Sequence, residues 1–184
     1  MRFEAASTVA FPADVVVRTL IRRMDDLVPH MPNVGAITTT VIEEQPDGRI
    51  KTVRAWQGTA SSVPAVLRPF VTKNSLGWVD YSIWDVGAGT CDWYIENVHS
   101  RFSSCSGLNA FLVDPDDPQA STILKVEGDF TVFGDKIPAM PGFLGKRVAP
   151  TIEKIIVSFM MPNFTAMAVG AQALLTELTA AGEL

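Results

Sequence analysis

The chain has 184 residues, of which 47% are hydrophobic and only 19% are charged, and its formal net charge is -5. A chain of this length can bury a core without a disulfide or a structural metal, and no linker-like segment divides it, so we expect one domain over residues 1-184. Its scattered basic residues exclude the electrostatic footprint of a nucleic-acid binder. The low charged share indicates that some apolar side chains face a cavity or a partner.

The beginning of the chain predicts a strand followed by a helix. Apolar or small side chains alternate up to Pro12, at Phe3, Ala5, Ser7, Val9 and Phe11. An apolar stripe at helical spacing then predicts a helix that stops at Pro29. This start lacks the apolar core of a signal peptide, so we expect a cytoplasmic protein in which Cys91 and Cys105 are free and buried.

A series of alternating segments punctuated by turn residues follows the first helix. The predicted strands are Ala36 to Glu44, Ile50 to Gln57, Gly77 to Val86, Thr90 to Val98, Arg101 to Val113 and Thr122 to Phe133. Residues Val63 to Val71, which carry two prolines, predict a short helix or an irregular connection. Together with the first strand, these segments predict a curved antiparallel sheet of six to seven strands.

The segment from Gly134 to Val148 is rich in glycine and proline and carries the apolar residues Ile137, Met140, Phe143 and Leu144. We interpret it as an apolar flap, because connections this long are commonly functional. Transient membrane contact through the 137-144 flap is one expected use. Pro150 then opens the final helix.

The final helix is almost uncharged, with 21 residues from Ile155 to Leu175 that carry no charge. This length would cross a bilayer, but Pro162, Asn163 and Gln172 argue against a lipid-facing span. We therefore expect a buried helix in a soluble α+β domain.

The final helix has one broad face that should meet the sheet. At helical spacing this face contains Ile152, Ile155, Ile156, Phe159, Met160, Asn163, Ala166, Met167, Gly170, Leu174 and Leu178. The opposite side is also apolar through the middle, at Val157, Met161, Phe164 and Ala168, which predicts burial by another part of the chain or by a second copy in a homodimer. Asn163 needs a backbone group, a water or a ligand, because a buried amide without partners is costly.

The order of strand, helix, meander, flap and long helix resembles the START/Bet v 1-like superfamily of polyketide cyclases and lipid-transfer proteins, and within it an uncharacterised bacterial family. The residues that carry this resemblance are Ala10 to Val16, Val126 to Val132, and Pro141 to Gly145 leading into Ile152-Glu153-Lys154. The resemblance implies a helix-grip fold, in which the sheet wraps around the C-terminal helix and encloses a hydrophobic cavity. It implies no catalytic residue, because the superfamily has no universal one.

Metal and cofactor motifs are not found in the sequence. His30 and His99 stand alone, without ligand spacing around them. There is no nucleophile elbow, phosphate-binding loop or dinucleotide fingerprint, so we predict no metal, no cofactor and no catalytic residue.

The aromatic residues suggest the walls of the cavity, since four tryptophans lie on predicted strands. The predicted ligand-binding residues are Trp56, Trp93, Asn97, Phe159, Asn163 and Met167. They predict binding or transfer of a hydrophobic small molecule such as a lipid, a sterol or a polyketide. The alternatives are a cyclase- or aromatase-like enzyme using Arg54, His99 or Arg101, and a protein-interaction domain using the outer strip of the last helix.

Overall fold

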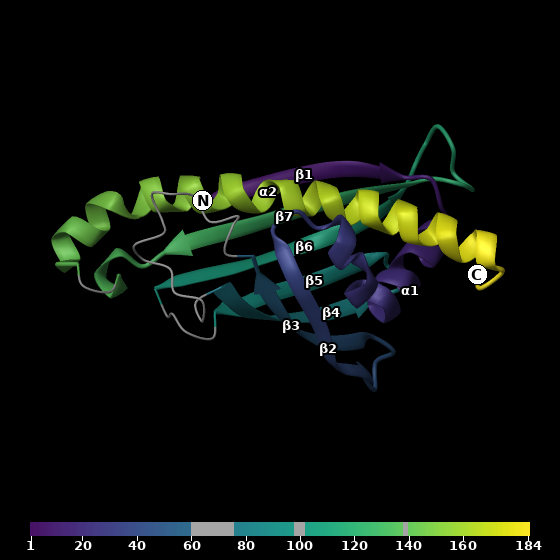
Figure 1. Cartoon of the computed structure of the whole chain (residues 1–184), viewed down its shortest axis with the longest axis horizontal. Coiled ribbons are helices and arrows are strands. Elements are labelled where there is room, and N and C mark those ends of the chain that lie inside the picture. The colour runs from purple at the N-terminus through teal and green to yellow at the C-terminus, as the bar shows by residue number, and fades with distance from the viewer. Residues whose placement is uncertain (60–75, 98–101, 138–139) are drawn as a thin grey trace.

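The computed structural model describes residues 1–59, 76–97, 102–137 and 140–184, and the predicted connection from Val63 to Val71 lies outside these ranges. The strands are β1 (Arg2–Val9), β2 (Val34–Glu44), β3 (Ile50–Gly58), β4 (Gly77–Asp85), β5 (Thr90–Asn97), β6 (Ser103–Val113) and β7 (Thr122–Val132). The helices are α1 (Ala13–Arg23), η1 (Met24–His30), η5 (Gly134–Lys136) and α2 (Gly142–Ala181). This is the predicted α+β helix-grip fold, with α2 lying lengthwise over a curved sheet (Figure 1).

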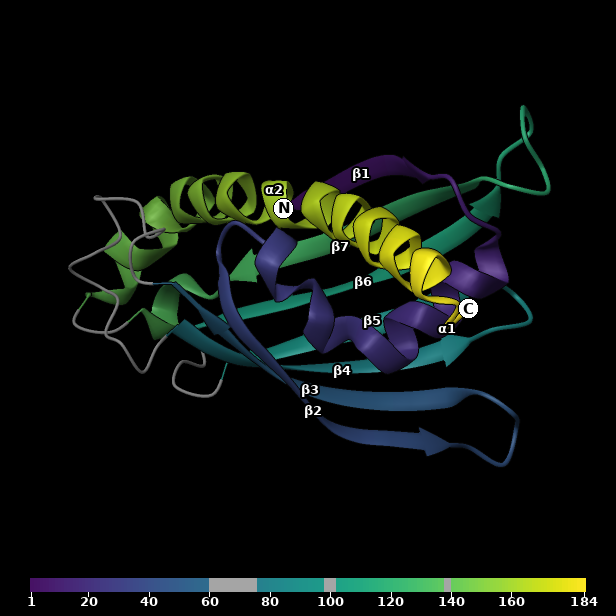
Figure 2. The ribbon, with the colours of Figure 1, turned by 45° about the vertical axis from the view of Figure 1, so that its right-hand side comes forward.

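The sheet is antiparallel throughout, in the order β1-β7-β6-β5-β4-β3-β2. Strands β2 to β7 each pair with their neighbours in the chain, and β1 pairs with β7. Gly48 and Gly89 adopt positive φ angles of 82° and 64°, which permits the tight turns after β2 and β4. Figure 2 shows α1, η1 and α2 on one face of the sheet, which we call the concave face.

Helix α2 packs on the sheet over a cross-strand row of two glycines that lie between two aromatic residues. Trp93 lies opposite Gly107, Gly107 opposite Gly128, and Gly128 opposite Phe3. A Cβ on Gly107 would lie 2.4 Å from the Trp93 ring, and one on Gly128 would lie 2.5 Å from the Phe3 ring. The glycines therefore make room for both rings to lie across the sheet. Phe164 of α2 stacks on Phe3, with ring centroids 5.3 Å apart.

The predicted flap from Gly134 to Val148 is wrong over much of its length. Helix α2 begins at Gly142, and Pro150 lies inside the helix instead of opening it. A Cβ on Gly145 would come within 1.8 Å of the carbonyl oxygen of Gly134. Glycine at these two positions thus serves a close contact between α2 and η5, whereas the sequence suggested loop residues.

The predicted inward face of α2 is confirmed at Met167, Gly170, Leu174 and Leu178, which are buried, but it leaves out other residues that are also buried. Val157 and Ala168, which we expected on the outer side, are 4% and 2% exposed, and Phe164 packs against the sheet. On the outer side, Val169 is 60% exposed. The buried face is therefore broader than the predicted one and includes part of the side that we expected to lie outward. The middle of the helix is apolar all round, so no polar side was available to fix its orientation.

Candidate functional site

At one end of the concave face, the sheet is sealed by α1. Arg54 of β3 is completely buried there. Its guanidinium donates hydrogen bonds to the Oγ1 atoms of Thr39 and Thr52, and to the carbonyl oxygens of Leu20 and Ile21 near the end of α1. Burial lowers the pKa of Arg54, and its hydrogen-bond partners are all groups of the protein itself. Arg54 therefore ties α1 to the sheet.

Two tryptophans also lie in this region, and the indole N–H group of each donates a hydrogen bond. Nε1 of Trp84 donates to Oγ1 of Thr52 at 3.0 Å, and Nε1 of Trp93 donates to Oδ1 of Asn109 at 2.9 Å. All four side chains are buried. We call Arg54 and these four residues the closed end of the concave face.

The two cysteines belong to the same buried interior. Cys91 and Cys105 are free and buried, as predicted. Burial raises the pKa of both thiols, in the case of Cys105 to about 12. Neither thiol is therefore an effective nucleophile near neutral pH.

The other end of the concave face carries a stacked pair of tryptophans that are only half-buried. Trp56 lies opposite Trp78, with ring centroids 5.8 Å apart and ring planes at 17°, and Trp78 lies opposite Asn97. Although Nε1 of Trp56 is fully buried, it has no hydrogen-bond partner among the described residues. A buried donor without a partner is costly, so this indole N–H is available to a ligand.

Asp80 lies beside Arg54, where the closed end meets the row of Trp56 and Trp78, and it was not among the residues predicted from the sequence. Its Oδ1 accepts a hydrogen bond from Oγ of Ser82 at 2.7 Å, and it lies opposite Arg54 in the register of β3 and β4. Burial raises the pKa of this carboxyl group, although Ser82 and Arg54 oppose the shift. Asp80 still retains accessible surface. We call Trp56, Trp78, Asp80 and Asn97 the open end.

The flank of α2 that faces η1 contributes the second unpaired group. Oδ1 of Asn163 is fully buried and has no hydrogen-bond partner in the described part of the chain. One helical turn earlier, the carbonyl oxygen of Phe159 accepts a hydrogen bond from Nδ2 of Asn33 at 3.2 Å. Two turns later, Gly170 packs against His30, to which a Cβ would come within 3.0 Å. Asn163 lies on the same side as these two contacts.

The structure separates the six predicted site residues into two groups. Trp56 and Asn97 lie in one cross-strand row at the open end, with Phe159 and Asn163 on the flank of α2. Trp93 and Met167 are 7% and 6% exposed and belong to the packed core, not to an accessible wall. For Trp93, the cause is the room that the two glycines provide. The proposed enzyme residues His99 and Arg101 lie outside the described ranges.

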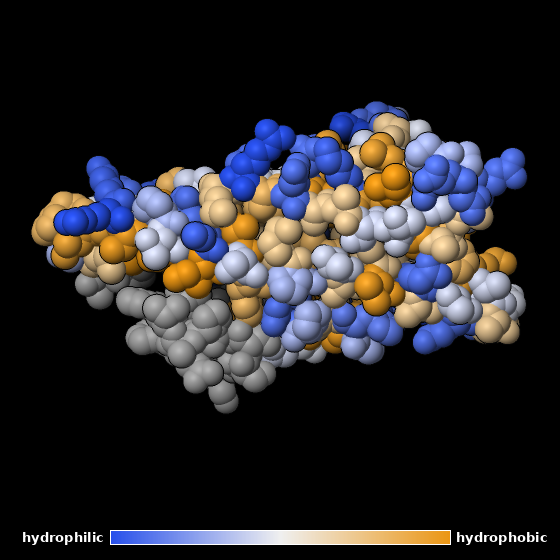
Figure 3. All heavy atoms as spheres, turned by 90° about the horizontal axis from the view of Figure 1, so that it is seen from above, coloured by the Kyte–Doolittle hydropathy of each residue, from blue (hydrophilic) through white to orange (hydrophobic). Residues whose placement is uncertain are grey.

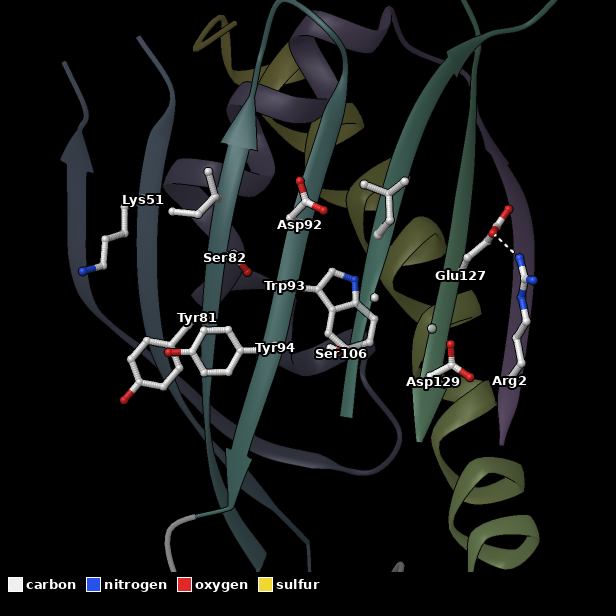
Figure 4. A pocket seen from close by; sticks show the side chains of 14 residues that line it. Arg2, Lys51, Tyr81, Ser82, Asp92, Trp93, Tyr94, Ser106, Glu127 and Asp129 are labelled. Atoms are coloured by element: carbon white, nitrogen blue, oxygen red, sulfur yellow. Dashed lines mark hydrogen bonds and ion pairs between the residues drawn. The ribbon is translucent and has the colours of Figure 1, made fainter. Parts of the chain in front are cut away.

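The convex face carries a separate hollow of about 580 Å³. Tyr81 and Tyr94 stack along one side of it, with ring centroids 4.7 Å apart, and Arg2 pairs with Glu127 at 2.9 Å on the other side (Figure 4). These side chains project away from α2. Trp93, one of the predicted site residues, also lines this hollow beside Gly107 and Gly128. The hollow therefore opens on the face opposite α2, and Trp93 is the predicted site residue that it reaches.

Metal binding finds no support in the described ranges. No group of three or more histidine, cysteine, aspartate or glutamate side chains is placed there to hold an ion. His30 packs beside Gly170 of α2.

Solved structures with the same fold span nearly the whole chain. A protein from Thermus thermophilus aligns with a TM-score of 0.64 and 15% identity over 94% of this chain and 95% of its own. The Zhui aromatase/cyclase from a Streptomyces species aligns with a TM-score of 0.60 and 14% identity, over 94% and 93%. Ara h 8.0201 aligns with a TM-score of 0.52 and 15% identity, over 94% and 98%. No protein-family model and no curated protein sequence matches the chain. The likenesses show a Bet v 1-like helix-grip fold.

Proposed function

We propose that this protein binds or transfers a hydrophobic small molecule, such as a lipid, a sterol or a polyketide, in a cavity between β3–β5 and α2. The observation that carries the proposal is a pair of buried polar groups without a partner among the described residues, one on β3 and one on α2. Nε1 of Trp56 is a donor and Oδ1 of Asn163 is an acceptor. Each unpaired group costs about 1 to 3 kcal/mol, a cost that a bound ligand offsets.

The chemistry of the open end favours an apolar ligand with a small polar group. The stacked rings of Trp56 and Trp78 and the half-buried side chain of Ile95 form a broad apolar wall. A hydroxyl group on the ligand both accepts and donates, so it matches the indole N–H and the amide oxygen. The ligand class we propose is therefore a flat or chain-like hydrocarbon with a hydroxyl or a similar group.

A second candidate is a cyclase- or aromatase-like enzyme that uses the same cavity. Arg54 is engaged with α1 at the closed end, so it is a structural residue in this account. In this candidate enzyme, Asp80 replaces Arg54 as the proton donor. A carboxyl group with a raised pKa keeps its proton to higher pH and can donate it to a bound carbonyl. One protein of similar fold is an aromatase/cyclase, which supports this alternative by analogy alone.

The predicted location and oligomeric state remain proposals. We retain the cytoplasmic location and the homodimer, but the apolar strip that suggested the dimer is not exposed. Val157 is buried, and Phe164 is stacked on Phe3. A dimer would therefore need another surface.

Native mass spectrometry of the purified protein, followed by solvent extraction, tests the proposal. We expect a co-purified apolar molecule, or saturable binding to at least one of lauric acid, dodecan-1-ol, cholesterol and 1-naphthol. Changing Trp56 to Phe and Asn163 to Leu together should lower the affinity by about tenfold or more, since both polar contacts are lost. A protein without cargo that binds none of the four probes would refute ligand binding.

A further inference from the structure

The first turns of α2 expose apolar side chains that nothing in the described part of the chain covers. Phe143 is 75% exposed, the highest value among the exposed large apolar side chains, and the adjacent Leu144 is 41% exposed. The opposite side of the helix holds Gly145, which is buried against Gly134. The helix is therefore fixed to the domain on one side and presents Phe143 to the surroundings on the other.

Cationic residues surround this apolar tip. Lys146 and Arg147 lie three and four positions after Phe143, which places all three side chains on one face of the helix. Lys136, on the adjoining η5, is also exposed. Residues 134 to 152 contain these three cations and a single acidic residue, although the whole chain has a net charge of -5. No ion pair within the described ranges engages the three cations.

The tip lies at the end of the molecule where the open end of the concave face lies. Helix α2 extends past the end of β7 on this side, away from α1 (Figures 1 and 2). Viewed from above, apolar and basic residues lie together at this extremity (Figure 3). A molecule that leaves the open end would therefore emerge near the tip.

We propose that the Phe143 tip, made of Lys136, Phe143, Leu144, Lys146 and Arg147, docks the protein on an anionic lipid bilayer. Aromatic and aliphatic side chains enter the interface between headgroups and acyl chains, while lysine and arginine contact anionic headgroups. This inference rests on the proposed function, because docking brings the open end to a source or an acceptor of an apolar ligand.

The proposed contact is peripheral, although α2 is long and apolar enough to cross a bilayer by length and composition. Ten residues between Gly145 and Leu178 of α2 are buried in the domain, and Phe164 packs on the sheet. A spanning helix would have to leave these contacts. The proposal also replaces the predicted loop flap by a helical tip, since Phe143 and Leu144 belong to α2.

Vesicle flotation tests the docking. We expect the wild-type protein to float with phosphatidylcholine vesicles that contain about 30% phosphatidylglycerol, and to be released when NaCl is raised from about 0.1 M to about 0.5 M. Changing Lys146 and Arg147 to Gln should weaken partitioning by about 25-fold, at about fivefold per cation. Phe143→Asp should weaken it by at least about tenfold.

Val169→Asp is the matched control, because Val169 is 60% exposed on the same helix but far from the tip. It should float like the wild type, and circular dichroism should show the wild-type fold in all variants. Equal flotation of the wild type and Phe143→Asp, or no flotation of the wild type, would overturn the docking.

Cargo is measured in the same samples by native mass spectrometry. A wild-type protein that carries an apolar molecule but does not float refutes docking and leaves the proposed function intact. A wild-type protein that floats but neither carries nor binds an apolar molecule supports docking and contradicts the proposed function.

Discussion

The tryptophans at the two ends of the concave face differ in the hydrogen bonding of their indole N–H groups. At the closed end, the indole groups of Trp84 and Trp93 donate to Thr52 and Asn109 at normal hydrogen-bond distances. At the open end, the side chain of Trp56 is only half-buried, but its Nε1 atom is fully buried and has no partner in the described ranges. The buried polar groups are therefore satisfied at the closed end, whereas one at the open end is left unpaired, and this difference is the basis of the proposed ligand site.

The largest expected effect belongs to the closed end. Changing Arg54 to Met leaves the carbonyl groups of Leu20 and Ile21 without their donor, so we expect the free energy of unfolding to fall by about 3 kcal/mol or more. Urea denaturation measures this change. Arg49→Met is the control, because Arg49 pairs with Asp47 on an exposed turn, and its loss should leave the free energy of unfolding close to that of the wild type. Equal effects of the two changes would contradict the anchoring role of Arg54.

A matched pair of tryptophan changes compares the two ends directly. Trp84→Phe and Trp56→Phe remove the same atoms, but only Trp84 loses a hydrogen bond. We expect Trp84→Phe to lower the free energy of unfolding by about 1 to 2 kcal/mol more than Trp56→Phe does. Ligand affinity should show the opposite order. If Trp56→Phe were the more destabilising change, the indole group of Trp56 would have a structural role.

Asn163→Leu should leave stability unchanged or raise it by up to about 1 kcal/mol, because it removes a buried acceptor that has no partner among the described residues. Thr165→Leu, at an exposed position of the same helix, controls for the better helix propensity of leucine. Thermal unfolding of both variants gives the comparison. A loss of more than about 1 kcal/mol in Asn163→Leu alone would show that the amide stabilises the protein itself.

Asp80 gives the smallest effect and a distinctive pH dependence. Its pKa is raised in the folded protein, so the folded state binds this proton more tightly than the unfolded state does. The resulting stability is fully present below the ordinary aspartate pKa of about 4, and it is lost as the pH rises through the folded value. Asp80→Asn should therefore gain stability relative to the wild type as the pH rises from about 4 to neutral.

Urea denaturation at several pH values measures this difference, with the exposed Asp92 changed to Asn as the control. The control should show no such gain. A gain that is larger at low pH than at neutral pH would contradict the assignment to Asp80.

The sequence predicted the sheet and the first helix well, because alternation of apolar residues is a local signal. Gly48 and Gly89 marked their turns for the same reason. The start of α2 was missed, because the contact of Gly145 with Gly134 joins two elements and leaves no local pattern. The full width of the buried face of α2 was missed because the middle of the helix has no polar side.

The candidate site shows the same division. Trp56 and Asn163 were predicted because a large aromatic residue on a strand and an amide in an apolar helix are visible in the sequence, and their contact with a ligand stays a prediction. The burial of Trp93 could not be predicted, because it depends on Gly107, which lies on the neighbouring strand. Asp80 was missed because its burial depends on the elements that cover β4, and these are set by the tertiary fold.

The most direct test of ligand binding at the open end is a nitrogen-15 nuclear magnetic resonance titration of the tryptophan indole groups, assigned through single Trp→Phe changes. The chain has four tryptophans, so each indole reports on its own region. With delipidated protein and the four probes named above, we predict that the Trp56 resonance shifts saturably with at least one probe, while those of Trp84 and Trp93 stay in place. Resonances that all remain unmoved, or shifts at Trp84 and Trp93 equal to that at Trp56, would contradict a ligand site at the open end.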